Sequence, residues 1–174
     1  QVPSTLQLTI GSILISLIIG VPLGIIAAIK HRSWIDALCM LFALVTVSAP
    51  TFWLALVMIL VFSVGLGWFP ATGSQGLRSL ILPTISLGMA SAGLIARLVR
   101  SSMLEVLSQN YIVTARSKGL RERIIILRHG FRNALIPTVT IIGLQIGNLL
   151  GGAVVVETVF ARQGLGRMVI QAIM

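Results

Sequence analysis

Four long apolar segments constrain the fold of this 174-residue chain more than any other feature. They run over residues 6–29, 35–64, 80–96 and 135–156. A hydrocarbon core about 30 Å thick takes about 20 apolar helical residues to cross. Because backbone polar groups must be paired within the segment when lipid surrounds it, each segment is predicted to be a spanning helix. The predicted fold class is an all-α membrane protein with a polytopic helical bundle.

The composition agrees with this class. Hydrophobic residues make up 56% of the chain and charged residues 10%, and the mean hydropathy is +1.03. These values leave too little polar surface for a soluble domain. We therefore interpret residues 1–174 as a single transmembrane domain. We also expect the complete domain to have one span before these residues and one after them.

Basic residues predict the orientation. Eight of the thirteen Lys and Arg residues lie in 97–133, between the third and fourth segments, and Lys30 and Arg32 follow the first. Short loops rich in Lys and Arg stay in the cytoplasm, so both loops are predicted to be cytoplasmic and residue 1 to lie outside. The net charge of +9 then follows from topology. No nucleic-acid partner is expected, because these loops offer no aromatic stacking surface beyond Tyr111.

Pro50 lies near the middle of the second segment. Its missing N–H and its ring are predicted to kink or break the helix there.

Glycine spacing predicts close helix contacts at two places. Gly20 and Gly24 are four residues apart, as are Gly147 and Gly151, and such spacing lets helix backbones approach each other. The alternative is chance in a chain with 17 glycines.

Three polar residues lie within the fourth segment. Gln145 and Asn148 are three residues apart and so share a helix face. They are costly in lipid, so they either join helices or line a translocation path. Glu157, near the outer end, either faces the path or reaches the membrane interface.

The basic loop 97–133 contains a predicted short helix. Its apolar and small residues recur with helical spacing at Tyr111, Ile112, Ala115, Gly119 and Leu120. Cations occupy other positions, at Arg116, Lys118 and Arg121. This pattern is typical of a helix that lies flat on a partner or a membrane. Ala115 and Gly119 are four residues apart, and their small size would let the partner approach the helix closely. The cations either pair with a partner's acidic groups or simply form a solvated face.

No catalytic or cofactor-binding pattern is present. The sequence has no Gly-x-x-x-x-Gly-Lys-Ser/Thr loop to cradle phosphates. Cys39 is the single cysteine, the two histidines are well apart, and no carboxylates are paired, so no metal site is expected. The chain is predicted not to be an enzyme and to bind no cofactor itself.

Two stretches of the loop resemble a known family. They are Tyr111-Ile-Val-Thr-Ala-Arg-Ser-Lys-Gly-Leu120 and His129-Gly-Phe-Arg-Asn-Ala-Leu-Ile-Pro137. Both are similar to the coupling loop of ATP-binding-cassette importer permeases, in the dipeptide, oligopeptide and nickel branch. Flanking stretches agree in order and spacing, namely Ser48-Ala-Pro-Thr-Phe-Trp-Leu54, Gly67-Trp-Phe-Pro-Ala-Thr-Gly73, Ala96-Arg-Leu-Val-Arg-Ser-Ser-Met-Leu-Glu105, Gly151-Gly-Ala-Val-Val-Val-Glu-Thr-Val-Phe160 and Gly164-Leu-Gly-Arg167.

The resemblance implies a type I (MetI-like) permease in the cytoplasmic (inner) membrane of a bacterium or archaeon. Such a subunit forms half of a translocation pathway. It works with a second permease subunit, two cytoplasmic ATPases that hold ATP and Mg²⁺, and an external binding protein. The resemblance assigns the ATPase contact to Tyr111, Thr114, Ala115, Arg116, Lys118, Gly119 and Leu120.

Two matters stay open at the level of the sequence. The implied substrate is a dipeptide or oligopeptide, with nickel chelate, glutathione or another small solute as alternatives. A secondary transporter or channel, a different functional class, would also be basic, kinked and helical. It would need an ion or proton site within the membrane, and only Gln145, Asn148 and Glu157 could supply one.

Overall fold

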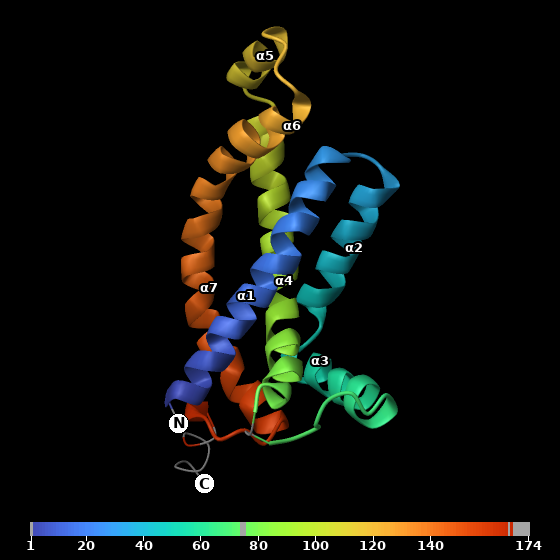
Figure 1. Ribbon diagram of the computed structural model, residues 1–174, viewed down its shortest axis with the longest axis vertical. Helices are drawn as coiled ribbons and strands as arrows, with labels where there is room; N and C mark the ends of the chain where they lie inside the picture. Colours follow the sequence, from blue (N-terminus) through green and yellow to red (C-terminus); the bar gives the residue numbers. More distant parts are fainter. Residues whose placement is uncertain (1, 74–75, 167, 169–174) are drawn as a thin grey trace.

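The computed structural model describes residues 2–73, 76–166 and 168, which form a tall helical bundle with no strand among them (Figure 1). The predicted fold class, an all-α polytopic bundle, is confirmed. Arg167, the last residue of the quoted sequence motifs, lies outside the described residues. The elements are α1 (Val2–Ile29), α2 (Trp34–Ser48), α3 (Thr51–Met58), the π-helix η1 (Ile59–Gly65), α4 (Arg78–Leu107), α5 (Asn110–Ser117), α6 (Glu122–Ile124), the π-helix η2 (Ile125–Phe131) and α7 (Arg132–Val159).

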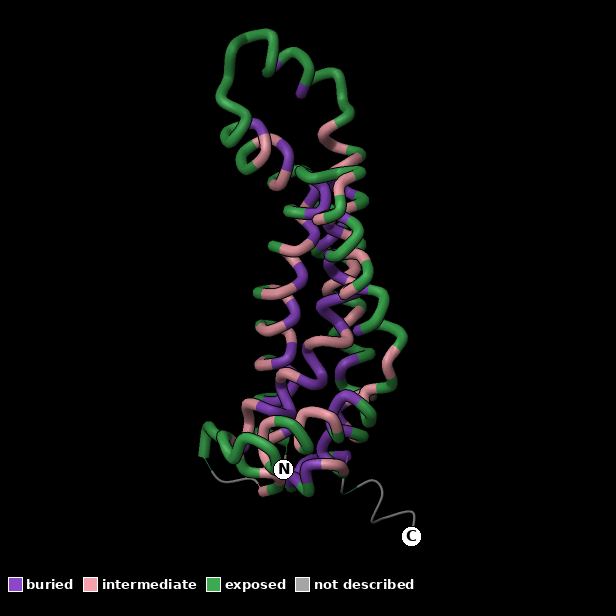
Figure 2. The backbone as a smooth tube through the Cα atoms, turned by 90° about the vertical axis from the view of Figure 1, so that its right-hand side faces the viewer, coloured by how far each residue is buried: buried purple, intermediate pink, exposed green. Residues whose placement is uncertain are grey.

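Helices α1 and α4 pack against each other along most of their length and form the centre of the bundle, where buried positions concentrate (Figure 2). Two glycines of α1 permit this approach. A Cβ atom added to Gly20 would lie 2.6 Å from the carbonyl oxygen of Ala92, and one added to Gly24 would lie 2.6 Å from that of Ala96. Since real Cβ atoms do not come so close, the contact requires glycine. The predicted contact at Gly20 and Gly24 is confirmed.

The second glycine pair behaves differently. Gly147 and Gly151 lie on an exposed face of α7, and a Cβ atom added to either would meet nothing within 4 Å. The predicted close contact is therefore not made by the described residues of this chain. The spacing is the same at both places, but it does not specify which helix faces that side of α7.

The second apolar segment, predicted as one span over 35–64 with a kink or break at Pro50, consists of two helical parts. It is broken at Ala49 and Pro50, and the two parts, Trp34–Ser48 and Thr51–Gly65, are bent by 104°. Ala49 has extended torsion angles, φ −74° and ψ 127°, which proline imposes on the residue before it. The 15 residues of α2 reach only about 22 Å at 1.5 Å per residue. The predicted break at Pro50 is confirmed, and it is sharper than a kink.

The predicted loop 97–133 is largely helical, so the third and fourth boundaries also change. Helix α4 continues to Leu107, beyond the predicted end at residue 96. Helical structure begins again at Glu122 and runs to Val159, over 38 residues. The stretch around α5 projects from one end of the bundle (Figure 1). The described residues hold three helices long and apolar enough to cross a membrane, or four spans if the bent pair counts as one.

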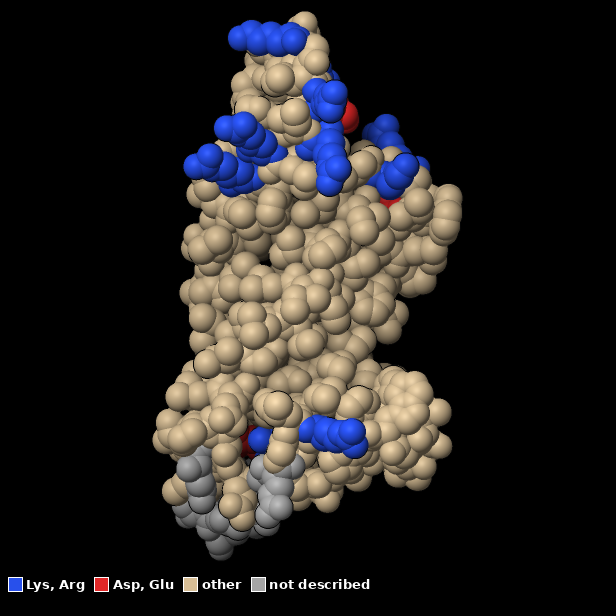
Figure 3. All heavy atoms as spheres, viewed as in Figure 1, with Lys and Arg blue, Asp and Glu red and all other residues tan. Residues whose placement is uncertain are grey.

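Lys and Arg side chains gather at the end of the molecule that carries α5 and the turn between α1 and α2 (Figure 3). Few appear at the opposite end. Both basic loops thus lie at the same end, as the predicted orientation requires. We refer to it as the cytoplasmic end.

The glycine contact yields a matched prediction. Gly24→Val should lower the thermal stability of the detergent-solubilised chain, because overpacking a close interface costs about 1–3 kcal/mol. Gly147→Val adds the same side chain where the chain leaves open space and should have little effect. Equal melting temperatures for both variants would contradict the close contact between α1 and α4 at Gly24.

Candidate functional site

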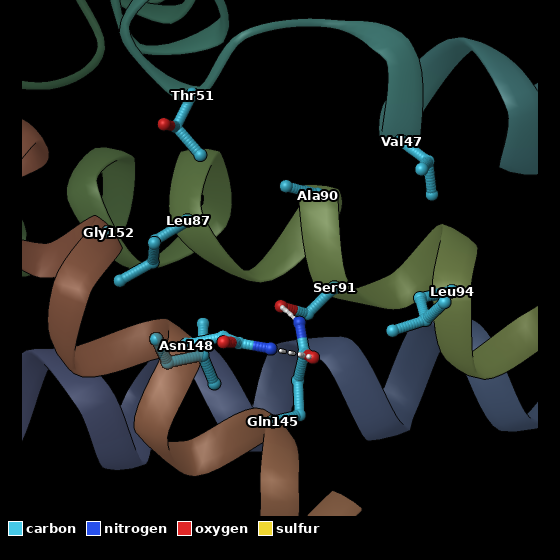
Figure 4. Close-up of a pocket in the computed structure, with 10 residues that line it drawn as sticks. Val47, Thr51, Leu87, Ala90, Ser91, Leu94, Gln145, Asn148 and Gly152 are labelled. Carbon is cyan, nitrogen blue, oxygen red and sulfur yellow. Dashed lines mark hydrogen bonds between the residues drawn. The ribbon is translucent and has the colours of Figure 1, made fainter. Parts of the chain in front are cut away.

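A cavity of about 290 Å³ lies beside the break between α2 and α3, with α4 and α7 forming its other walls (Figure 4). It brings together residues from the consecutive helices α2 and α3 with residues from α4 and α7, which are far apart in sequence. The lining residues are Val47, Thr51, Leu87, Ala90, Ser91, Leu94, Gln145, Asn148, Leu149 and Gly152. The break at Pro50 matters here, because it places the end of α2 and the beginning of α3 at the same cavity.

Two of the predicted pathway residues form a hydrogen-bonded series in this cavity (Figure 4). Gln145 Nε2 donates to Ser91 Oγ at 3.1 Å, and Asn148 Nδ2 donates to Gln145 Oε1 at 3.2 Å. Ser91 is buried, Gln145 is half-buried and Asn148 is exposed. Gln145 therefore joins α7 to α4. The carboxamide of Asn148 lines the cavity and uses one of its two N–H groups on Gln145.

The chemistry of this lining is neutral. Its polar side chains are two carboxamides and two hydroxyls, and none of the lining residues is charged. Such groups donate and accept hydrogen bonds without fixing a net charge on what they contact. The sequence pattern did not indicate Ser91 as a member of this group, since a serine within an apolar helix has no distinctive spacing.

The structure does not bring Glu157 together with Gln145 and Asn148. Glu157 is 1% exposed. Its Oε1 accepts a hydrogen bond from Thr5 Oγ1 at 2.5 Å, and its Oε2 accepts one from the Gly166 N–H at 2.9 Å. Glu157 thus ties the beginning of α1 to the chain that follows α7. Its buried, hydrogen-bonded carboxylate therefore has a structural role at the end of the bundle opposite to α5.

At the cytoplasmic end, α5 follows α4 after only two intervening residues. Ile112 is fully buried, and together with Ala115 it packs on Ile125 of η2 and on Leu107. Asn133 Nδ2 also donates to the Tyr111 hydroxyl at 2.8 Å. The short helix is therefore held by the ends of both long helices that flank it.

Most predicted coupling residues are exposed on this helix and the turn after it. The exposed ones are Tyr111, Thr114, Arg116, Lys118, Gly119 and Leu120. Ala115 is the exception, because it packs within the chain. Ala115 and Gly119 do not share a face of α5, since the helix ends at Ser117. Gly119 instead ends the helix with φ +76°, a conformation that favours glycine.

The cations of the coupling segment differ in their surroundings. Arg116 Nη2 lies 2.7 Å from Glu122 Oε1, and the hydrogen bond to this carboxylate raises the pKa of the Arg116 guanidinium above its ordinary value. Both side chains are about half exposed, so the pair adds little stability. Among the described residues Lys118 forms no ion pair, which leaves its charge open to a partner.

A family model described as "Binding-protein-dependent transport system inner membrane component" matches residues 20–174. Glutathione transport system permease protein GsiC of Escherichia coli (strain K12) is 47% identical to this chain over 169 residues. The proteins of the same name are 47% identical in Shigella flexneri serotype 5b (strain 8401) and 46% identical in Salmonella paratyphi A. In each case the match covers 97% of this chain and 55% of the relative. The chain thus spans about half the length of these relatives.

The packing of α5 can be tested with neighbouring residues. Ile112→Ser should speed amide hydrogen exchange throughout α5, because it removes the buried side chain that holds the helix to η2. Val113, which is 55% exposed, supplies the control Val113→Ser. If Ile112→Ser left exchange in α5 as slow as in the control, the helix would not be held in the way described.

Proposed function

The chain belongs to the family of binding-protein-dependent transport system inner membrane components, and on this premise we propose that it is half of the translocation pathway of an ATP-driven importer. It is a multi-pass protein of the inner membrane and a transport subunit rather than an enzyme. The observation that carries the proposal is the placement of α5. This exposed short helix lies at the cytoplasmic end and is held by both α4 and η2–α7.

The proposed mechanism is mechanical. ATP-driven closure of two ATPases moves their docking grooves together, and α5, seated in one groove, passes this displacement to α4 and α7 as rigid-body motion. The exposed Tyr111, Thr114, Lys118, Gly119 and Leu120 supply the contact surface. Lys118 can pair with an acidic group of the ATPase, while Ala115 supports the helix from behind.

The proposed partners follow from this arrangement. A second permease subunit completes the pathway, two ATPases dock in the cytoplasm, and a binding protein delivers substrate outside. ATP and Mg²⁺ are held by the ATPases, in agreement with the lack of a phosphate-binding loop in this sequence. Membrane lipid surrounds the remaining apolar faces, and no nucleic acid takes part.

The proposed substrates are small peptides, and glutathione is the first to test. Three relatives about 47% identical to this chain carry the name of a glutathione transport permease, and glutathione is itself a peptide. The cavity supports this choice, because the carboxamide of Asn148 can donate to and accept from an amide group. Nickel chelate remains the alternative within the same architecture.

A variant at Gly119 tests the ATPase contact. Gly119→Trp should reduce co-purification of the ATPase and abolish uptake. An added Cβ atom at this position meets nothing within 4 Å in this chain, so a loss caused by bulk reports on a partner. Gly119→Ala is the control, since it carries the backbone strain of a positive φ with little bulk. Normal co-purification and uptake with Gly119→Trp would exclude this contact.

A variant at Asn148 tests the pathway. Asn148→Leu should lower uptake by about tenfold, which corresponds to about 1.4 kcal/mol in the barrier, the scale of one neutral hydrogen bond. Complex yield should not change, because Asn148 is exposed and its carboxamide nitrogen donates a hydrogen bond to Gln145 on the same helix. Thr140→Leu, on another exposed part of α7, is the control. Parallel loss of yield and uptake would instead assign Asn148 to helix packing.

A further inference from the structure

A partly buried ion pair joins α2 to α4 near the cytoplasmic end. Arg100 Nε donates to Asp36 Oδ1 at 2.6 Å, and Arg100 Nη2 donates to Asp36 Oδ2 at 2.7 Å. The Asp36 side chain is 8% exposed and that of Arg100 is 23% exposed. Two parallel hydrogen bonds between a guanidinium and a carboxylate fix both distance and orientation.

The turn between α1 and α2 is built around the same carboxylate. Arg32 adopts φ +61°, and its N–H donates to Asp36 Oδ2 at 3.1 Å. His31 Nδ1 lies 3.3 Å from Asp36 Oδ2 and 3.1 Å from Arg100 Nη2. Ser33 caps α2 by accepting a hydrogen bond from the Asp36 N–H. The position of Asp36 is therefore defined independently of the apolar packing of α2.

Apart from this ion pair, helix α2 packs on α1 and α4 through apolar and small residues. Much of its surface is exposed, including Leu41 at 56% and Leu44 at 53%. It meets α4 again at Gly93, where an added Cβ atom would lie 2.5 Å from the carbonyl oxygen of Ala43. The bidentate ion pair adds a directional contact at the cytoplasmic end of α2, and this contact fixes the register of α2 on α4.

Helices α2 and α4 together connect the coupling helix α5 with the cavity beside Pro50. Arg100 lies two turns before the end of α4, which leads into α5. At its other end α2 stops beside the cavity, where Val47 and Thr51 line the wall on either side of the break. A displacement of α4 thus reaches the cavity wall through α2, provided that α2 moves with α4.

We propose that the Asp36–Arg100 ion pair is the linkage that makes α2 follow α4, so that movement of the coupling helix α5 changes the shape of the cavity beside Pro50. Asp36 and Arg100 are positioning residues in this account and contact no substrate. The inference rests on the transport function proposed above. An ion pair whose carboxylate is buried and whose guanidinium is partly exposed contributes little net stability compared with an apolar replacement, which agrees with a role in register.

The first experiment removes both charges together. Asp36→Leu/Arg100→Met leaves no unpaired buried charge, so complex yield and binding-protein-stimulated ATPase activity should stay near those of the parent. Uptake per ATP hydrolysed should fall by about tenfold. Arg97→Met, which removes an exposed cation one turn earlier on α4, should keep normal coupling. Normal uptake per ATP in the double variant would overturn the proposal.

The second experiment joins the two helices covalently. In a Cys39→Ala background, Asp36→Cys/Arg100→Cys would be joined by bifunctional thiol reagents of graded length. Because the linkage stays closed through the cycle, the joined protein should recover the coupling that the unjoined double-cysteine protein lacks. If the joined protein were inactive while the unjoined form transported normally, the pair would be a gate that opens, and the proposal would be wrong.

A third measurement needs no transport and so separates this proposal from the function on which it rests. Spin labels at Leu44→Cys on α2 and Thr140→Cys on α7, again without Cys39, report the position of α2 in the isolated chain. The neutral double variant should broaden the distance distribution, and Arg97→Met should not. An unchanged distribution would overturn the linkage, even if uptake assays showed that the chain transports nothing.

Discussion

The contact between α1 and α4 is the interaction on which the rest of the structure depends. Two glycines of α1 let its backbone meet the carbonyl oxygens of Ala92 and Ala96, and in lipid such close packing replaces the hydrophobic driving force that soluble helices have. Helix α4 becomes the axis of the bundle as a result. Both α2 and α7 pack on it, and the cavity forms where these two helices and α3 surround its middle.

The axis also gives the fold a direction. One end of α4 leads into the exposed helix α5 at the basic end of the molecule, and its middle supplies Ser91 to the cavity. A displacement of α4 at the basic end therefore reaches the cavity, whose lining contains no charged side chain. This separation suits a subunit whose energy source is on another protein. It suits a secondary transporter poorly, because the carboxylate of Glu157, which could supply an ion site, accepts hydrogen bonds from Thr5 and Gly166 instead.

Features set by local chemistry could be predicted from the sequence. Apolar length indicated the spans, charge indicated the cytoplasmic loops, and Pro50 indicated the break. The 104° angle at that break could not be predicted, because it depends on where α3 packs. Gly20 and Gly147 carry the same spacing, yet only Gly20 meets a helix of this chain. The pair of Asp36 and Arg100 spans 64 positions and depends on helix register. An acid at the beginning of an apolar segment was the signal that could have pointed to it.

The most direct test of the account is uptake into proteoliposomes that contain the complete importer, with its second permease subunit and ATPases. Labelled glutathione and a labelled dipeptide would be offered with the binding protein outside and ATP inside. The account predicts accumulation that requires both ATP and the binding protein and that is unaffected when ion gradients are dissipated. Accumulation that followed an ion gradient without ATP would contradict it.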